Sequence, residues 1–435
     1  MSFRTRTGLL LAGAALGLAT GGEATAASDD EIAALRAQIE AMQERLDELE
    51  TKQQETEREV TETRENTLSA GSTPGRYKLP VTDTEIAIGG YVKTDFIFDV
   101  NEGVGDLFIP ENIDTGDAAD ESNFRVHARQ SRINLQTFTP TEWGELATLI
   151  EGDFFGGGGN QTFSNSRPFR LRHATVTLGA LRVGQYWTNF MPIESYPATV
   201  DFQGPAGIPF IRQAQIRYTH DVDDNLAISA SLENSEFSGR DAEEVFVETD
   251  EIGIRAGVDR APDLTAAVTY GDDWGLVKAA GLGRYLGSPL GEGDGASAWG
   301  VNLSGNVAPW QGGKLLGSFT YGEGVGRYII NGVGQDAFVE ADGGVEPIES
   351  WGVTAQISQA FTPELTGAVA FGRYQVEETF APDDLDHVNT VHTSLFYSPL
   401  DRVTFGGEVI WGNREDADGA SDDNVRLQGA IQVDF

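Results

Sequence analysis

Residues Asn424 to Phe435, NVRLQGAIQVDF, carry the clearest alternation of apolar and polar side chains in the chain. The apolar residues are Val425, Leu427, Ile431, Val433 and Phe435, and the polar residues between them are Arg426, Gln428, Gln432 and Asp434. Because successive side chains of a β-strand point to opposite faces, this pattern predicts a strand with one apolar and one polar face. The apolar face would lie inside a soluble sandwich but outside a membrane barrel, so alternation alone does not distinguish the two.

Segments of this kind recur from Ile86 to the C-terminus, and we count sixteen of them as strands. Glu251 to Asp259 is one of these segments, whereas Gly271 to Ala296 is expected to form a long loop. Short turns alternate with long polar connections, which is typical of an up-and-down barrel whose short turns lie at the periplasmic rim. We therefore predict an all-β fold, a 16-stranded antiparallel transmembrane β-barrel, over residues 86–435. An extracellular β-sandwich or solenoid is the alternative.

Three segments precede the predicted barrel. Two arginines, a short apolar run and a small-residue stretch predict a secretory signal peptide over residues 1–26. Residues 29–66 predict a periplasmic α-helical coiled coil because apolar residues recur there at spacings of three and four. Those apolar residues are Ile32, Leu35, Ile39, Met42, Leu46, Leu49 and Val60. A single amphipathic helix lying on the rest of the protein is the alternative, and residues 67–85 are expected to be a linker.

The composition of the chain agrees with a water-filled barrel. The 435 residues have a formal net charge of -38 and include no cysteine. A barrel of sixteen strands encloses an aqueous channel, so its inner face tolerates charge. Most acids lie in expected loops, where they either gather divalent cations and lipopolysaccharide or are simply solvated. Without cysteine there are no disulfides or thiolate metal sites, and we expect no cofactor, metal site or nucleic-acid partner.

Cations are concentrated on a few strand faces of this acidic chain. Alternation against apolar neighbours predicts that eight residues face the lumen and bind solute: Lys93, Arg125, His127, Arg129, Arg132, Arg182, Tyr186 and Arg217. Strict alternation fails between Arg129 and Arg132, which predicts a β-bulge near Gln130 and Ser131. Arg170 and Arg172 do not fit the alternation of their strand, so we expect them above the membrane or at a subunit interface. Lumenal guanidinium groups would concentrate anions at a constriction.

Acids offer an alternative interpretation of the arginines. The arginines could pair with carboxylates to give a transverse electric field across the lumen without an excess of positive potential. The candidate partners are Asp95, Glu151, Asp153, Glu194 and Asp201.

Four stretches carry a family resemblance: SRINLQTFTPTEWGELATLIEGDFFG from Ser131, RLRHATVTLGALRVGQYWTNFM from Arg170, ATVDFQGPAG from Ala198, and QGAIQVDF at the C-terminus. They resemble the DcaP-like family of outer-membrane porins. The resemblance runs from about Asp29 to the end of the chain. It implies a homotrimer in outer-membrane lipid, a periplasmic coiled coil, and passage of small anions including dicarboxylates. It also implies that Phe435 belongs to the signal read by the barrel-assembly machinery, and that the loop Thr188 to Ile211 folds inward.

Other functions are weighed against transport. The chain has five histidines and no G-x-S-x-G nucleophile motif, so we do not expect an enzyme. A phosphate-type porin would favour lysine-rich loops, but the barrel region has only Lys93, Lys278 and Lys314. An envelope tether with little transport role is the remaining alternative, because its coiled coil could bind a periplasmic partner.

Overall fold

The computed structural model describes residues 28–65, 67–116, 121–160, 162–240, 245–247, 260–288 and 294–435. The chain divides into two compact units, one ending at Thr67 and one running from Leu68 to Phe435. The predicted signal peptide, residues 1–26, lies outside the described residues.

The first unit contains one helix, α1 (Asp29–Glu65), among its described residues. Ser28 and Glu31 form a reciprocal capping box at its N-terminus: the Ser28 N–H donates to the Glu31 carboxylate at 3.1 Å, and the Glu31 N–H donates to Ser28 Oγ at 3.4 Å. The apolar stripe from Ile32 to Val60 is exposed, and Met42 is 63% exposed. No helix in the described part of the chain is both long enough and apolar enough to cross a bilayer.

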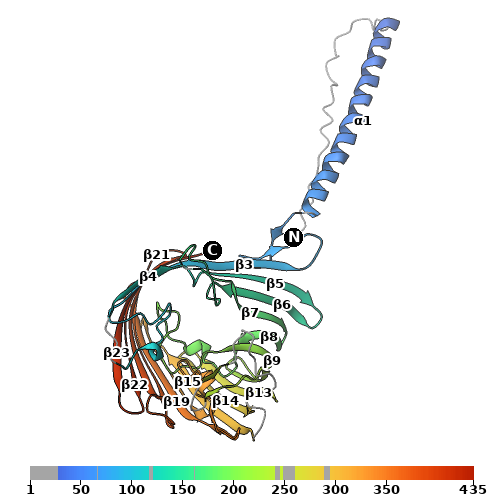
Figure 1. Ribbon diagram of the computed structural model, residues 1–435. Coiled ribbons are helices and arrows are strands. Elements are labelled where there is room, and N and C mark those ends of the chain that lie inside the picture. The colour runs from blue at the N-terminus through green and yellow to red at the C-terminus, as the bar shows by residue number, and fades with distance from the viewer. Residues whose placement is uncertain are drawn as a thin grey trace. The chain divides into compact units, whose positions relative to one another are not determined.

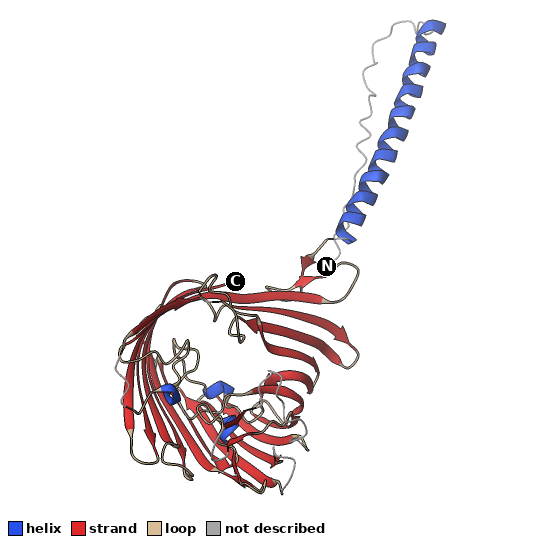
Figure 2. Ribbon diagram, in the orientation of Figure 1, coloured by secondary structure: helices blue, strands red, loops and turns tan. Residues whose placement is uncertain are grey.

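The second unit is a closed antiparallel β-barrel (Figures 1 and 2). In the described residues its wall has sixteen strand positions, with β4 and β5 sharing one, and β23 pairs with β3 to close it. The wall strands are β3 (Glu85–Asp99), β4 (Asn123–His127), β5 (Arg132–Thr141), β6 (Gly144–Asp153), β7 (Arg170–Leu178), β8 (Leu181–Trp187), β9 (Arg212–Asp221), β10 (Leu226–Glu233), β13 (Asp263–Asp272), β14 (Gly275–Leu286), β15 (Ala296–Val307), β16 (Gly313–Glu323), β19 (Glu349–Ala360), β20 (Leu365–Val376), β21 (Leu385–Leu400), β22 (Val403–Asp416) and β23 (Ser421–Asp434).

Shorter elements accompany the wall. They are β1 (Ser69–Ala70), β2 (Tyr77–Lys78), β11 (Ser238–Arg240), β12 (Val245–Val247), β17 (Ala337–Val339), β18 (Val345–Pro347), and the 3-10 helices η1 (Pro110–Asn112), η2 (Ile193–Ser195) and η3 (Gly326–Tyr328). The pair β1 and β2 lies within residues 67–85, and β2 pairs with β3.

The predicted strand number is confirmed, but one wall strand, β14, lies in a segment that was not expected to form a strand. Glu251 to Asp259, which we expected to form a strand, lies outside the described residues, whereas β14 occupies residues 275–286 of the interval 271–296 that was expected to be a long loop. The alternation of β14 is weak because its outward positions include Ala279, Gly281 and Gly283. Small residues give little hydropathy contrast, so this strand could be taken for a loop.

Burial shows which way the strand faces point. On β23, Leu427 and Val433 are 46% and 44% exposed, whereas Arg426 and Gln428 are buried. The apolar face is therefore outside and the polar face inside, which is the arrangement of a membrane barrel and the reverse of a soluble sandwich.

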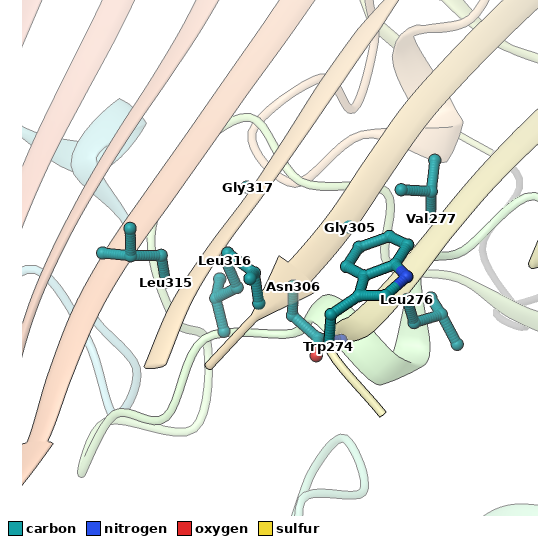
Figure 3. A pocket seen from close by; sticks show the side chains of 9 residues that line it. Trp274, Leu276, Val277, Gly305, Asn306, Leu315, Leu316 and Gly317 are labelled. Atoms are coloured by element: carbon teal, nitrogen blue, oxygen red, sulfur yellow. The ribbon is translucent and has the colours of Figure 1, made fainter. Parts of the chain in front are cut away.

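Glycines shape a groove on the outer wall near a short-turn end (Figure 3). Gly305 on β15 and Gly317 on β16 leave space for an apolar groove of about 240 Å³. Trp274, in the turn between β13 and β14, lies along it together with Val277 and Leu315. The groove is lined almost entirely by apolar surface, as a wall that faces lipid requires.

Candidate functional site

Residues 188–211, which we call the inward loop, connect β8 to β9 and lie inside the barrel. Side chains of distant wall strands bind the main chain of this loop. The contacts are Lys278 Nζ to Met191 O (2.7 Å), Gln356 Nε2 to Ala198 O (2.8 Å), Val200 N to the Glu408 carboxylate, Lys93 Nζ to Val200 O (2.7 Å) and Ala206 N to Thr390 Oγ1 (2.9 Å). Because these partners come from β14, β19, β22, β3 and β21, the loop crosses the lumen and narrows it.

The inward loop contacts the wall through its own backbone at Gly207. This residue has φ +81°, and a Cβ placed there would lie 1.9 Å from the carbonyl oxygen of Arg373 on β20. From the other side, a Cβ on Gly352 would lie 2.1 Å from the Gly207 oxygen. Glycine is therefore required at both positions for the loop to sit this close to β19 and β20.

Replacing Gly207 by alanine is expected to push the inward loop away from β19 and β20, into the passage. We expect single-channel conductance in planar bilayers to fall, because the added Cβ has no room on the wall side. Gly281→Ala is the matched control, since nothing lies within 4 Å of a Cβ at that outward position. Equal conductance of the wild type and G207A would contradict this account.

The wall that faces the passage from β5 to β9 carries six arginines, which we call the arginine wall. They are Arg132 on β5, Arg170 and Arg172 on β7, Arg182 on β8, and Arg212 and Arg217 on β9. Arg172 is 2% exposed and Arg217 is 9% exposed, whereas Ile216 and Tyr218, which flank Arg217, lie on the exposed outer face.

The expectation that Arg170 and Arg172 lie away from the lumen was wrong, because a bulge changes the register of β7. Glu151 on β6 pairs with His173, but the next residue, Gly152, pairs with Leu171. Arg172 is thus the extra residue, and both Arg172 and His173 are buried. Alternation counted back from Ala174 assigns the wrong side to every residue before the bulge.

Acids neutralise part of the arginine wall. Arg172 donates from Nε to Glu151 (2.9 Å) and from Nη1 to Asp153 (3.0 Å). Arg170 also binds Asp153 at 2.8 Å, and Arg132 lies 3.6 Å from Glu151. The two carboxylates offset most of the charge of these three guanidinium groups.

Arg125 and Arg129, on and just after β4, meet an acid from the loop that connects β3 to β4, which we call the first long loop. Asp106 binds Arg125 at 3.0 Å and also pairs with Arg129, and Arg167 lies 3.8 Å from it. His127, between the two arginines, is buried with Nε2 3.4 Å from the Asp106 carbonyl oxygen. The break between β4 and β5 has one extra residue, since the register advances five positions from His127 to Arg132 but four on β3, from Asp95 to Tyr91.

Lys93 has a different environment from the arginines. It is buried, lies 2.9 Å from Asp95, and donates to the Val200 carbonyl at 2.7 Å. Its ammonium group therefore holds the inward loop in place.

Three arginines of the wall have only neutral partners in the described part of the chain: Arg182, Arg212 and Arg217. Arg182 Nε donates to Thr177 Oγ1 at 3.3 Å, and its guanidinium lies 4.2 Å from the ring centroid of Tyr186. Arg217 Nη2 donates to the Trp187 carbonyl at 2.5 Å. We call these three residues the open arginines.

An aromatic cluster packs against the arginine wall. Arg172 lies 5.2 Å from the ring of Phe202 in the inward loop, and Arg212 lies 4.8 Å from that of Trp187. Phe155 stacks on Phe202 with centroids 5.4 Å apart. Sequence reasoning missed Arg212 because alternation along β9 groups it with the outward residues Ala214 and Ile216. It missed Phe202 because alternation gives no information about loop residues.

Metal-ligand side chains gather at one place in the described residues, away from the arginine wall. Asp386 and His387 at the start of β21 and Glu415 near the end of β22 have ligand atoms within 4.8 Å of one another. His387 Nδ1 already hydrogen-bonds Asp386 at 2.7 Å.

Comparison with known proteins agrees with this architecture. A family model described as DcaP outer membrane protein matches residues 18–429. The outer membrane channel DcaP of Acinetobacter baumannii has a TM-score of 0.71 at 21% identity, over 85% of this chain and 100% of that chain. The anion-selective porin from Comamonas acidovorans has a TM-score of 0.52 at 14% identity, over 81% of this chain and 100% of that chain. The trimer form of OmpT from Vibrio cholerae has a TM-score of 0.51 at 10% identity, over 81% of this chain and 99% of that chain. No curated protein matches the chain.

Proposed function

The chain belongs to the DcaP outer membrane protein family, and from this membership and the geometry of the passage we propose that it is a porin for passive, anion-preferring diffusion of small solutes such as dicarboxylates. The observation that carries the anion preference is the group of open arginines, Arg182, Arg212 and Arg217, which face the narrowed lumen with neutral partners. Arginine keeps its charge at all physiological pH values and binds a carboxylate with two parallel hydrogen bonds.

The balance of charge along the passage supports this preference over a purely transverse field. Glu151 and Asp153 compensate Arg132, Arg170 and Arg172, so that part of the wall resembles the alternative of paired charges. The open arginines add positive potential beyond those pairs. Across a passage comparable with the Debye length of about 8 Å at physiological salt, this potential reaches a permeating ion.

The experiment that tests the proposal is a reversal-potential measurement on the purified protein in planar bilayers. Chloride, phosphate, and mono- and dicarboxylates are each placed in a gradient. We expect anions to permeate more readily than potassium, and dicarboxylates to pass more readily than phosphate. Cation preference at moderate salt would refute the anion preference, and the absence of any conductance would favour the envelope-tether alternative.

We also propose that α1 forms a periplasmic coiled coil in a homotrimer. The exposed stripe of α1 supports this, because apolar residues at heptad spacing are stable in water only when a partner covers them. Phe435, which is 51% exposed at the end of the last strand, would carry the signal for barrel assembly, and the outward apolar face would contact lipid and lipopolysaccharide.

Mass measurement of the purified protein in detergent is expected to give three chains per particle. Replacing Leu35 and Leu46 by glutamate should lower the helical signal in far-ultraviolet circular dichroism, because charges in the heptad seam separate the helices. Ala34→Glu and Ala41→Glu lie on the same helix outside the seam and should leave the signal unchanged. A mass corresponding to monomer alone would exclude the trimer.

A further inference from the structure

Arg182 and Arg217 occupy an unusual position for two like charges. They are direct cross-strand partners on β8 and β9, and Val183 and Ile216 beside them lie on the exposed outer face. Like charges directly opposite each other on a sheet are destabilising. A protein normally offsets such a pair with an acid, as Glu151 and Asp153 do for the arginines of β7.

The hydrogen bonds of this pair leave donors free. Arg182 binds a threonine hydroxyl and Arg217 binds a backbone carbonyl, and both partners are neutral. Arg217 is nine-tenths buried, and its Nε has no hydrogen-bond partner. A buried, charged donor without an acceptor is costly, so an acceptor from solution would stabilise it.

A recess of about 500 Å³ opens beside the two guanidinium groups. It lies at the end of β7, β8 and β9 near the short turn Gly179 to Ala180, and we call it the rim recess. Its other lining residues are Thr177, Thr219, His220 and Asp221. Guanidinium groups and threonine hydroxyls together form a donor set suited to carboxylate and phosphate oxygens.

We propose that the rim recess is a binding site for a small carboxylate, held by Arg182 and Arg217 at the short-turn mouth of the barrel. The proposal rests on the anion-preferring passage described above. It adds a solute-binding site at the periplasmic end of that passage, where the short turns of such barrels lie. Asp221 offsets one of the two positive charges. The site therefore keeps a net charge of about one and binds weakly enough to release its solute, as conduction requires.

Block of the chloride current by succinate tests the site on the full-length protein in planar bilayers. Inorganic phosphate is the second arm, because its tetrahedral oxygens would use the same donors. Wild-type channels should show saturable block by succinate, stronger than the block by phosphate. Arg217→Gln and Arg182→Gln should each raise the half-blocking concentration at least about tenfold, the effect expected for one lost charge-assisted hydrogen bond.

Lys314→Gln is the matched control. Lys314 is the second residue of β16, at the short-turn end of the barrel, and is exposed, so this variant removes the same charge from the same rim but not from the recess. Equal effects of K314Q and R217Q would overturn the proposal, since they would indicate diffuse screening. Anion-preferring channels without saturable block would also overturn it while leaving the proposed function intact. Stronger block by phosphate than by succinate would overturn the carboxylate assignment, and a cation-preferring wild type would instead refute the proposed function.

Discussion

Replacing Arg182, Arg212 and Arg217 together by glutamine is expected to abolish the anion preference of the channel. In the described residues these open arginines form no ion pair, so their removal subtracts positive charge that nearby carboxylates such as Asp221 offset only in part. A unit charge about 4 Å from an ion contributes about 1 kcal/mol even in water, a change of roughly fivefold in local anion concentration for each arginine. The carboxylates of the passage and its mouth then dominate, and the reversal potential in a KCl gradient should move to the cation side.

The matched control removes three cations from the rim of the barrel: Lys78, Lys314 and Arg402. The net charge of the chain changes equally in the two variants. Only the arginine variant should lose selectivity, since charges in bulk-like water are screened within about one Debye length of 8 Å. If both variants shifted the reversal potential equally, the preference would come from net charge and not from the open arginines.

Replacing Arg426 by methionine is expected to release two loops from the barrel wall at once. Arg426 is completely buried and holds Asp99 on β3 with bonds of 2.6 and 3.0 Å. It also binds Asp201 of the inward loop at 3.4 Å and the Gly105 carbonyl of the first long loop at 2.7 Å. Removing one partner of a buried ionic group costs about 3–5 kcal/mol, because the remaining charges stay buried.

The measurable result of this loss is an open passage. We expect R426M to show higher and noisier single-channel conductance, and to unfold at a lower temperature in detergent. Burial raises the pKa of Asp201, and the guanidinium of Arg426 opposes that rise in the wild type. A raised pKa means that docking of the loop is favoured below it and lost as the pH rises through it, so acid pH should partly restore low conductance in R426M.

Arg284→Met is the control for R426M. Arg284 is equally buried and pairs with Asp263 at 3.2 Å and Asp336 at 3.0 Å, but it binds neither Asp99 nor Asp201. It should lower stability without releasing the first long loop. Unchanged conductance of R426M would show that the other wall contacts suffice to hold the inward loop.

The sequence predicts the barrel well where side chains contrast strongly along a strand. The resemblance to the family and the number of strands are confirmed, and β23 has the two faces that its alternation indicates. β14 was missed because Ala279, Gly281 and Gly283 weaken the pattern. The prediction failed for Arg172 because a bulge is a property of two paired strands, and one strand read alone does not reveal it.

The sequence did not predict which charged groups lie next to each arginine of the passage. Asp106 lies in a loop and reaches Arg125 and Arg129 only after that loop folds into the lumen. Likewise, alternation along β8 and β9 places Arg182 and Arg217 on the inner face but does not reveal that they are direct partners, since strand register is a property of the folded sheet. The assignment of the eight predicted residues as solute ligands stays a prediction that the selectivity measurements can test.

The contact between Gly207 and the wall strands has a consequence for how such channels can diverge. Main-chain atoms of the inward loop rest on main-chain atoms of β19 and β20, and Gly352 and Gly372 allow the same close approach from the wall. The fit of the loop against β19 and β20 is therefore set by backbone geometry at a few glycines, while solute preference depends on side chains elsewhere on the loop and on β5 to β9. Mutation can then alter what the pore admits without altering its width. In an engineered nanopore built on this scaffold, the side chains that contact the solute could be replaced one at a time while Gly207, Gly352 and Gly372 are kept.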